Sequence, residues 1–210
     1  KIGVTPNFQT QYLRRTDVYQ VEPLAHNPYP TDPTINGGTE LSHPTWDFYD
    51  CRTDCPIQLP FKFCYFNQVY EHIFVWSNGA VTFTPNGNCS PSTYHSFMDE
   101  VFTGPLPNGL VNNNFLNSIF GSYQHTHFSK VNYPTGSVNY QVYGTAPCRK
   151  FVISFHNMPA AGLFPTNCPP PVPLQSHQIV LHELTNVIDV NIIQHDNCPS
   201  NDPIESSAVI

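Results

Sequence analysis

The chain has 210 residues with 22 prolines, 11% charged residues and a net charge of −7, to which lysine and arginine contribute only eight residues. So few basic residues exclude a surface that neutralises nucleic-acid phosphates, and we expect no nucleic-acid partner. No apolar run approaches the roughly 20 residues of a membrane span, so we expect no membrane insertion. The many prolines disfavour long helices and favour turns and edge strands.

The first 50 residues are predicted to form an irregular N-terminal arm. Residues 1–50 are irregular, and the stretch 23–33 is especially rich in proline, which favours extended or turn-like backbone. We expect this arm to pack on a sheet or to be exchanged with a neighbouring molecule. Residues 51–210 then form the folded domain.

Strand patterns begin at Ile57. Residues 57–66, IQLPFKFCYF, alternate with the period of a half-buried strand. Residues 72–84, HIFVWSNGAVTFT, contain two strands around Asn78–Gly79, a strong hairpin signal because both turn residues need positive φ. Trp76 lies among apolar neighbours there, so we expect it in the core.

The second half of the chain continues the pattern. The segment 115–124, FLNSIFGSYQ, predicts one helical turn at most. Residues 137–144 alternate, residues 149–158 read as a buried strand, and residues 177–195 form two strands around Thr185–Asn186. Short strands separated by turns predict an all-β fold, namely an antiparallel β-sandwich, with a closed barrel as the alternative architecture.

The seven cysteines favour a secreted protein stabilised by disulfides. Cys168 and Cys198 flank the last predicted hairpin, so a bridge between them would close its open end. Cys51 and Cys55 are close enough to bridge within one turn, and a zinc site is the alternative for this pair. An odd number of cysteines leaves one thiol free or bonded to another chain.

Two histidines are the best candidates for metal binding. His125 and His127 are two apart, so on a strand they would share one face and could bind zinc or copper. The alternative is a polar loop, and we expect no cofactor. Motifs such as G-x-S-x-G and H-E-x-x-H do not occur, so we expect a protein that is not an enzyme, with a histidine-based metalloenzyme as the alternative.

Several blocks of sequence resemble one known family. The segment LPFKFCYFNQVYEHIFVWSNGAVTF is similar to the pattern LPF-x-FCFFG-x-x-Y-x-x-x-x-x-x-SNG, and GTAPCRKFVISFHNMP is similar to GTAPCR-x-FVV-x-F-x-x-VP. NSIFGSYQ, QIVLHELTNVIDVNI and CPSNDPIESSAVI follow in the family's order. The chain thus resembles, over roughly residues 18–210, a β-rich extracellular domain of Bacteroidota proteins that is distantly similar to nidogen-like (NIDO) domains.

The resemblance implies a role outside the cell. Such domains often precede a gliding-motility-type or type B sorting domain read by the type IX secretion system, which implies a structural or adhesive cell-surface module with no established catalytic residues. One departure is QHTHFSK, where the family has an acidic H-D-I-D-P, so an acidic metal site is not expected here. The family's last strand continues beyond AVI, so a neighbouring subunit could complete it.

Two functions follow from these observations. The first is a structural or adhesive surface module, with further copies of the chain as partners in a homo-oligomer or filament. The second is a carbohydrate- or ligand-binding module of a larger secreted protein, with surface glycans as partners. In that case exposed aromatic side chains would stack on sugar rings, and the candidates are Trp46, Tyr94 and Tyr123.

Overall fold

The computed structural model describes residues 32–41, 56–83, 117–123, 126, 135–160, 172–196 and 208–209. The regular elements of these residues are strands: β1 (Thr39–Leu41), β2 (Ile57–Tyr65), β3 (Gln68–Trp76), β4 (Ala80–Thr82), β5 (Ser118–Phe120), β6 (Ser122–Tyr123), β7 (Ser137–Tyr143), β8 (Lys150–Pro159), β9 (Leu174–His182), β10 (Ile188–His195) and β11 (Ala208–Val209). In this part of the chain, no helix is long and apolar enough to span a membrane.

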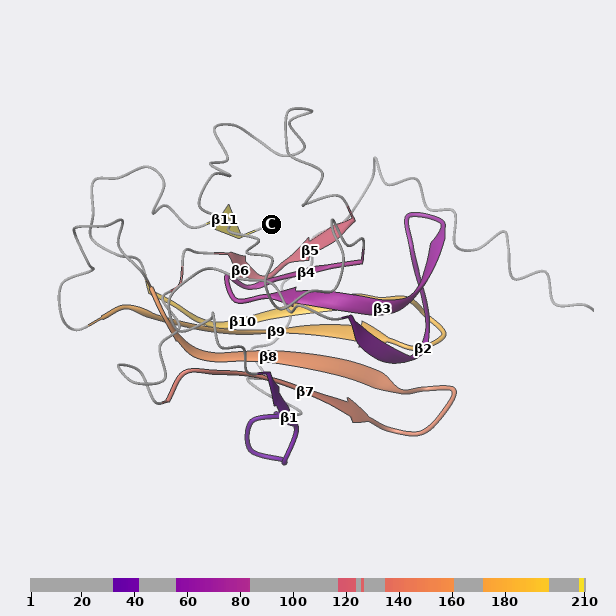
Figure 1. Ribbon diagram of the computed structural model, residues 1–210, viewed down its shortest axis with the longest axis horizontal. Coiled ribbons are helices and arrows are strands. Elements are labelled where there is room, and N and C mark those ends of the chain that lie inside the picture. Colours follow the sequence, from indigo (N-terminus) through magenta and orange to yellow (C-terminus); the bar gives the residue numbers. More distant parts are fainter. Residues whose placement is uncertain are drawn as a thin grey trace, which may run out of the picture.

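Two antiparallel sheets form the sandwich. One has five strands in the order β1-β7-β8-β9-β10, and the other has four in the order β2-β3-β4-β5. Figure 1 shows β7, β8 and β9 as one layer with β3 and β4 lying over it. A third, small sheet pairs β11 with β6. The all-β sandwich predicted from the sequence is confirmed.

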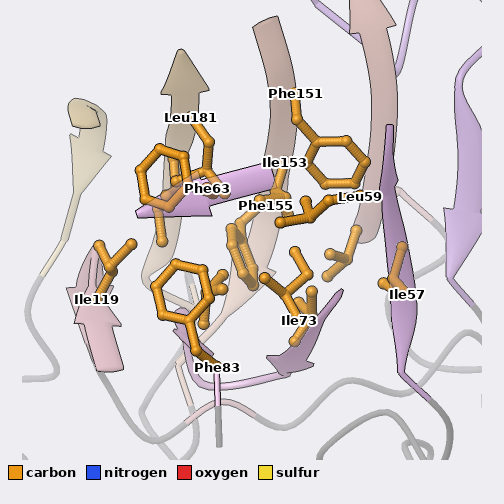
Figure 2. Packing of buried hydrophobic residues seen from close by; sticks show 14 of the residues in the cluster. Ile57, Leu59, Phe63, Ile73, Phe83, Ile119, Phe151, Ile153, Phe155 and Leu181 are labelled. Carbon is orange, nitrogen blue, oxygen red and sulfur yellow. The ribbon is translucent and has the colours of Figure 1, made fainter. Parts of the chain in front are cut away.

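The core lies between the two large sheets. Phe63, Ile73 and Phe83 come from one side, while Ile153 and Phe155 come from the other. Figure 2 shows side chains of both sheets pointing toward one another. Each large apolar side chain buried in this way contributes about 1.5–3 kcal/mol, so this layer holds the sheets together.

Strand β2 follows the predicted alternation. Ile57, Leu59, Phe61 and Phe63 are buried, whereas the residues between them are exposed or half-buried. The strand also contains Pro60, which lacks an amide hydrogen and is tolerated because β2 is an edge strand. Its register with β3 is interrupted around the proline.

The hairpin between β3 and β4 lies where Asn78–Gly79 predicts it, but its turn differs. Trp76 pairs with Ala80, so the turn has three residues, and among them only Gly79 has positive φ. The amide of Gly79 donates to the carbonyl of Trp76 over 3.1 Å. A three-residue loop needs only one positive φ, at its last residue. Trp76 is buried, as expected.

The predicted helical turn within residues 115–124 is wrong. Residues 118–120 form β5, and residues 122–123 form β6. Ile119 is buried against the core, and β5 pairs with β4. Burial of one side of this short segment between neighbouring strands outweighs its weak helical pattern.

Two expectations concern the ends of the chain. β1 lies inside residues 1–50 and pairs with β7 at the edge of the five-stranded sheet. The domain boundary at residue 50 stays a prediction. β11 pairs with β6 of the same chain, and its completion by a neighbouring subunit stays a prediction.

Candidate interaction surface at the turn end

Three turns lie at the same end of the sandwich, at the right of Figure 1: those between β2 and β3, between β7 and β8, and between β9 and β10. We call this the turn end. Its backbone conformations, ion pairs and exposed side chains distinguish it from the rest of the described chain.

The β2–β3 turn contains only Phe66 and Asn67, because Tyr65 and Gln68 are paired. Both turn residues have positive φ, +45° and +61°, as a two-residue type I′ turn requires. Asparagine tolerates this conformation, whereas a bulky aromatic residue rarely adopts it because its Cβ crowds the backbone. Phe66 is nevertheless 61% exposed. An unfavourable backbone conformation therefore holds an aromatic ring in solvent.

The β9–β10 turn repeats this feature. Leu184 has a φ of +67° and Asn186 a φ of +52°. The amide of Asn186 donates to the carbonyl of His182 over 3.1 Å, and the amide of His182 donates to the carbonyl of Val187 over 3.0 Å. These bonds fix the turn, and Leu184 projects from it with 64% of its surface exposed.

A hydrogen bond links strand β2 of one sheet to the β9–β10 turn of the other. The amide of Cys64, in β2, donates to Oδ1 of Asn186 over 2.8 Å. Next to it, the hydroxyl of Tyr65 donates to the carbonyl of Ser118 over 2.9 Å. Burial, and to a lesser degree the neighbouring Tyr70, raises the pKa of Tyr65 to about 12, so this hydroxyl keeps its proton at neutral pH. The stem of the β2–β3 hairpin is thus anchored to β5 and to the β9–β10 turn.

An ion pair fixes the β7–β8 loop to the same turn. Arg149 donates to Glu183 through Nη2 over 2.6 Å and through Nε over 2.8 Å. The side-chain hydrogen bond is the main reason why the pKa of Glu183 is lowered and that of Arg149 is raised. The guanidinium also lies 5.6 Å from the ring centroid of Phe61 in β2. The planar fork of arginine makes this bidentate pair directional.

Exposed apolar side chains gather on these anchored turns. Five of the six large exposed apolar residues of the described chain are there, including Val142 next to the β7–β8 loop, and the sixth is Ile35. Two exposed, free thiols lie at the same end. We define the turn-end surface by six exposed residues: Cys64, Phe66, Val69, Cys148, Leu184 and Val187. Exposed apolar residues that gather in one region favour a site of interaction.

A different cluster lies between the sheets, on the part of β9 farther from the turn end. His177 is fully buried, and its ring stacks on Phe155 with centroids 4.3 Å apart. A Cβ on Gly121 would lie 2.2 Å from Cδ2 of His177, and one on Gly79 would lie 2.7 Å from Cε1. Burial is the main reason why the pKa of His177 is lowered to about 3. The imidazole is therefore neutral and fills space that two glycines leave open.

Ser122 joins this cluster. Its hydroxyl is hydrogen-bonded to Nδ1 of His195 in β10, and His195 also helps to lower the pKa of His177. Ser122 is fully buried, so a substrate cannot reach its hydroxyl. The pair therefore links β6 to β10 as part of the packing. We call Gly79, Gly121, Ser122, His177 and His195 the histidine cluster.

Most site residues predicted from the sequence lie outside the described residues. These are the disulfide candidates Cys51, Cys55, Cys168 and Cys198, the metal candidates His125 and His127, and the stacking candidates Trp46 and Tyr94. Tyr123 has its backbone in β6, and its side chain is not among the parts that the structure describes. Thr126, between the two histidines, donates to Oδ1 of Asn78 through its amide over 3.2 Å. All of these assignments stay predictions.

Sequence reasoning missed the turn-end surface. One signal was present: Phe66–Asn67 separates two alternating runs by two residues, the length of a tight hairpin. No local sequence pattern predicts the positive φ of Leu184. In the part of the chain that the structure describes, no group of three or more His, Cys, Asp or Glu residues could hold a metal ion.

The fold defines a class of protein: an antiparallel β-sandwich with apolar side chains exposed on anchored turns. A family model described as NIDO related matches residues 25–209. The chain belongs to this NIDO-related family. Such domains are typically extracellular, which favours a secreted or cell-surface location.

The family assignment agrees with the distant NIDO-like resemblance seen in the sequence. It gives no support to an origin in Bacteroidota, to gliding motility or to type IX secretion. The comparison with curated proteins found no match, and neither did the comparison with solved structures.

Proposed function

We propose that this chain is a secreted cell-surface module with a structural or adhesive role, and that it contacts its partner through the turn-end surface. One observation carries the proposal. Phe66 and Leu184 combine positive φ with more than 60% exposure, and the bond between Cys64 and Asn186 joins the strand before the first turn to the second turn.

Folding gives no reason to keep these two side chains. A non-glycine residue in the left-handed region costs about 1–2 kcal/mol, and asparagine or glycine would lower this cost. The rings and methyl groups of exposed residues gain little from the core. Phe66 does pack edge-on against Tyr65, with centroids 4.6 Å apart, but most of its surface remains in water. Burial against a partner would supply the gain that the isolated domain lacks.

The anchored turns suit binding in a second way. A contact surface that is ordered before binding loses less conformational entropy when its partner arrives. The Arg149–Glu183 pair and the Cys64–Asn186 bond order the turns of both sheets. We therefore expect the surface to have nearly the same shape in the free and the bound protein.

A carbohydrate-binding module is the alternative function, with Trp46, Tyr94 and Tyr123 as stacking residues. A glycan array distinguishes the two. Binding to defined glycans that survives replacement of Phe66 and Leu184 but is lost on replacement of the three aromatic residues would favour the alternative. We propose further that the module is not catalytic, since Ser122, whose hydroxyl is hydrogen-bonded to His195, is itself fully buried.

Location is tested on intact cells that produce the protein. A membrane-impermeant biotin reagent should label the chain on the cell surface or in the medium. Labelling that requires lysis would contradict the proposed location.

Contact is tested with beads that carry the purified chain. We expect retention on intact producing cells to fall at least tenfold for the double variant Phe66→Asn/Leu184→Asn. The matched control is Ile35→Asn, because Ile35 is 81% exposed but precedes β1, on the opposite edge of the five-stranded sheet from β10. Equal retention of the double variant and the wild type would overturn the proposed surface.

A further inference from the structure

We propose that the outer edge of β10 joins two copies of this chain, with Val190 of both copies at a two-fold axis and the two five-stranded sheets continued into one. The hydrogen bonding of β10, the composition of the sheet edges and the register that β10 allows with itself all support this contact. It is separate from the turn-end surface, so the proposed function does not depend on it.

In the described chain, β10 pairs on one side only. The amide of His182 donates to the carbonyl of Val187 over 3.0 Å, so these two residues form a hydrogen-bonded pair. In an antiparallel ladder such pairs alternate with pairs whose backbone groups point away from each other. Along the register with β9, Ile188, Val190 and Ile192 belong to the second kind. Their amides and carbonyls point away from β9, and no strand of the described chain lies on that side.

The backbone of this edge is ordered before any partner binds. Ile188 and Val190 are half-buried and pack against the core between the sheets. The pairing with β9 is regular from Ile188 to Ile192, and its register shifts only after that. An ordered edge loses little conformational entropy when a second strand arrives. β10 therefore presents a regular row of donors and acceptors with which an extended strand can pair.

The other edges of the two large sheets have features that prevent such pairing. β1 and β5 contain only three residues each. β2 contains Pro60 and Lys62, and its register with β3 is interrupted. Short strands, proline, lysine and irregular pairing are the features by which proteins avoid contact between sheet edges. The eight residues of β10 include neither proline nor lysine, so among these four edges β10 is the one open to a second strand.

A second copy fits this edge because β10 is complementary to itself. An antiparallel pair with Val190 on the two-fold axis places Ile188 of each copy opposite Ile192 of the other. The outward amides and carbonyls of these three residues then meet in hydrogen-bonded pairs. Their side chains are half-buried in the single chain, and pairing would cover them further on the side of the core.

The polar residues of β10 select the same register. With Val190 on the axis, Asp189 lies opposite Asn191 of the second copy, whose amide can donate to the carboxylate. Asp189 is bonded to His182 over 2.6 Å, and 38% of its side chain is still exposed. A register centred on Asp189 would instead place two carboxylates opposite each other, which is unfavourable. A register centred on Asn191 would include the irregular pairing that follows Ile192.

This contact is closed after two copies. It uses the open edge of both copies at once, and the outer edges of the joined sheet are then the short β1 strands. A two-fold contact of this kind gives a dimer. Because five residues of one strand form a small interface, we expect the dimer to be weak and to depend on concentration.

The first test measures association of the purified full chain by sedimentation equilibrium at pH 7 and low salt, from about 10 μM to about 1 mM protein. We expect a monomer–dimer equilibrium. Asn191→Asp places a second carboxylate opposite Asp189, twice in each dimer, and should raise the dissociation constant about fivefold. Asn191→Lys places an opposite charge there and should lower it about threefold.

Gln141→Asp and Gln141→Lys are the matched controls. Gln141 is half-buried like Asn191, but it lies in β7, which β8 and β9 separate from β10. These variants change the net charge by the same amount, and they should leave the dissociation constant unchanged. Equal effects at Gln141 and Asn191 would overturn the inference, because net charge alone would then control association.

A second measurement uses the wild type alone, in case a variant does not fold. Amide hydrogen exchange followed by NMR should slow with increasing protein concentration at Ile188, Val190 and Ile192, and should not change in β7. A chain that stays monomeric up to the highest concentration, or a dimer in which these three amides exchange as fast as in the monomer, would overturn the inference. A monomer that still binds cells would leave the proposed function standing.

Discussion

The histidine cluster buries polar side chains, whereas the turn end exposes apolar side chains. In the histidine cluster, polar side chains are buried: His177 and Ser122 lie between elements that are distant in sequence. At the turn end, apolar side chains are exposed, and Phe66 and Leu184 hold backbone conformations that disfavour them. Polar side chains usually face solvent and large apolar side chains are usually buried, so both regions depart from the usual distribution.

The buried polar side chains and the exposed apolar side chains have different consequences for stability. A buried imidazole that fits between two glycines is packed on all sides, so any change of volume there disturbs several strands at once. An exposed side chain on a turn has few neighbours, so its replacement leaves folding almost unchanged. The histidine cluster thus contributes to folding, whereas the role we propose for the turn-end surface is contact with other molecules. The predictions below test this division.

The largest effect should come from Gly121→Ala. The new methyl group would lie 2.2 Å from the ring of His177, and the ring cannot retreat because it is stacked on Phe155. We expect the free energy of unfolding to fall by about 3 kcal/mol, measured by urea denaturation at pH 7.

The double variant Gly121→Ala/His177→Ala serves as the control. If the clash with the ring is the cause, the methyl group should cost much less once the ring is gone, and the two losses should not add. Additive losses would mean that Gly121 is needed for another reason.

The next effect concerns pH. Burial lowers the pKa of His177 to about 3, whereas the unfolded histidine keeps a pKa near 6.5. Between these values the unfolded chain binds a proton that the native protein does not. This contribution to stability is complete above pH 6.5 and is lost as the pH falls toward 3.

From pH 6 to pH 4 the free energy of unfolding should therefore decrease by about 1.4 kcal/mol per pH unit because of this residue. His177→Gln should remove that part of the slope, in urea unfolding curves recorded at each pH. Parallel slopes for variant and wild type would show that His177 is protonated in the native state.

Two substitutions at Asn186 examine the link between the sheets at the turn end. Both Asn186→Gly and Asn186→Ala remove the acceptor for the Cys64 amide, which should cost about 1 kcal/mol. Alanine must in addition adopt a φ of +52°, so its total loss should be about 2 kcal/mol. Thermal and urea unfolding measure both. Equal losses for glycine and alanine would show that the left-handed conformation is not required.

Local patterns were sufficient to predict most of the sheet. Alternation found β2 and β7, and apolar runs with turn residues found β8 and the β9–β10 hairpin. Strand β5 was missed because three residues are too few to show a period, and its pairing with β4 crosses a long stretch of sequence. The three-residue β3–β4 turn was missed because Asn-Gly also fits a two-residue loop.

The candidate site was harder to predict, since it depends on contacts between distant residues. Cys64 and Asn186 are 122 positions apart, and nothing local marks their turns as neighbours. Phe66 was read as the end of a strand because phenylalanine is typical of strands and rare in turns. The burial of His177 depends on Gly79 and Gly121, which only the packed sheets bring to its ring.

The most direct test of the division between the two regions is the free energy of unfolding of Phe66→Asn/Leu184→Asn, measured in urea beside the wild type. Asparagine accepts positive φ at both positions, while the lost edge contact with Tyr65 is worth about 0.5–1.5 kcal/mol. The account predicts a stability equal to that of the wild type or up to about 1 kcal/mol higher. A loss of 2 kcal/mol or more would contradict it, because Phe66 and Leu184 would then be retained for folding and not for contact.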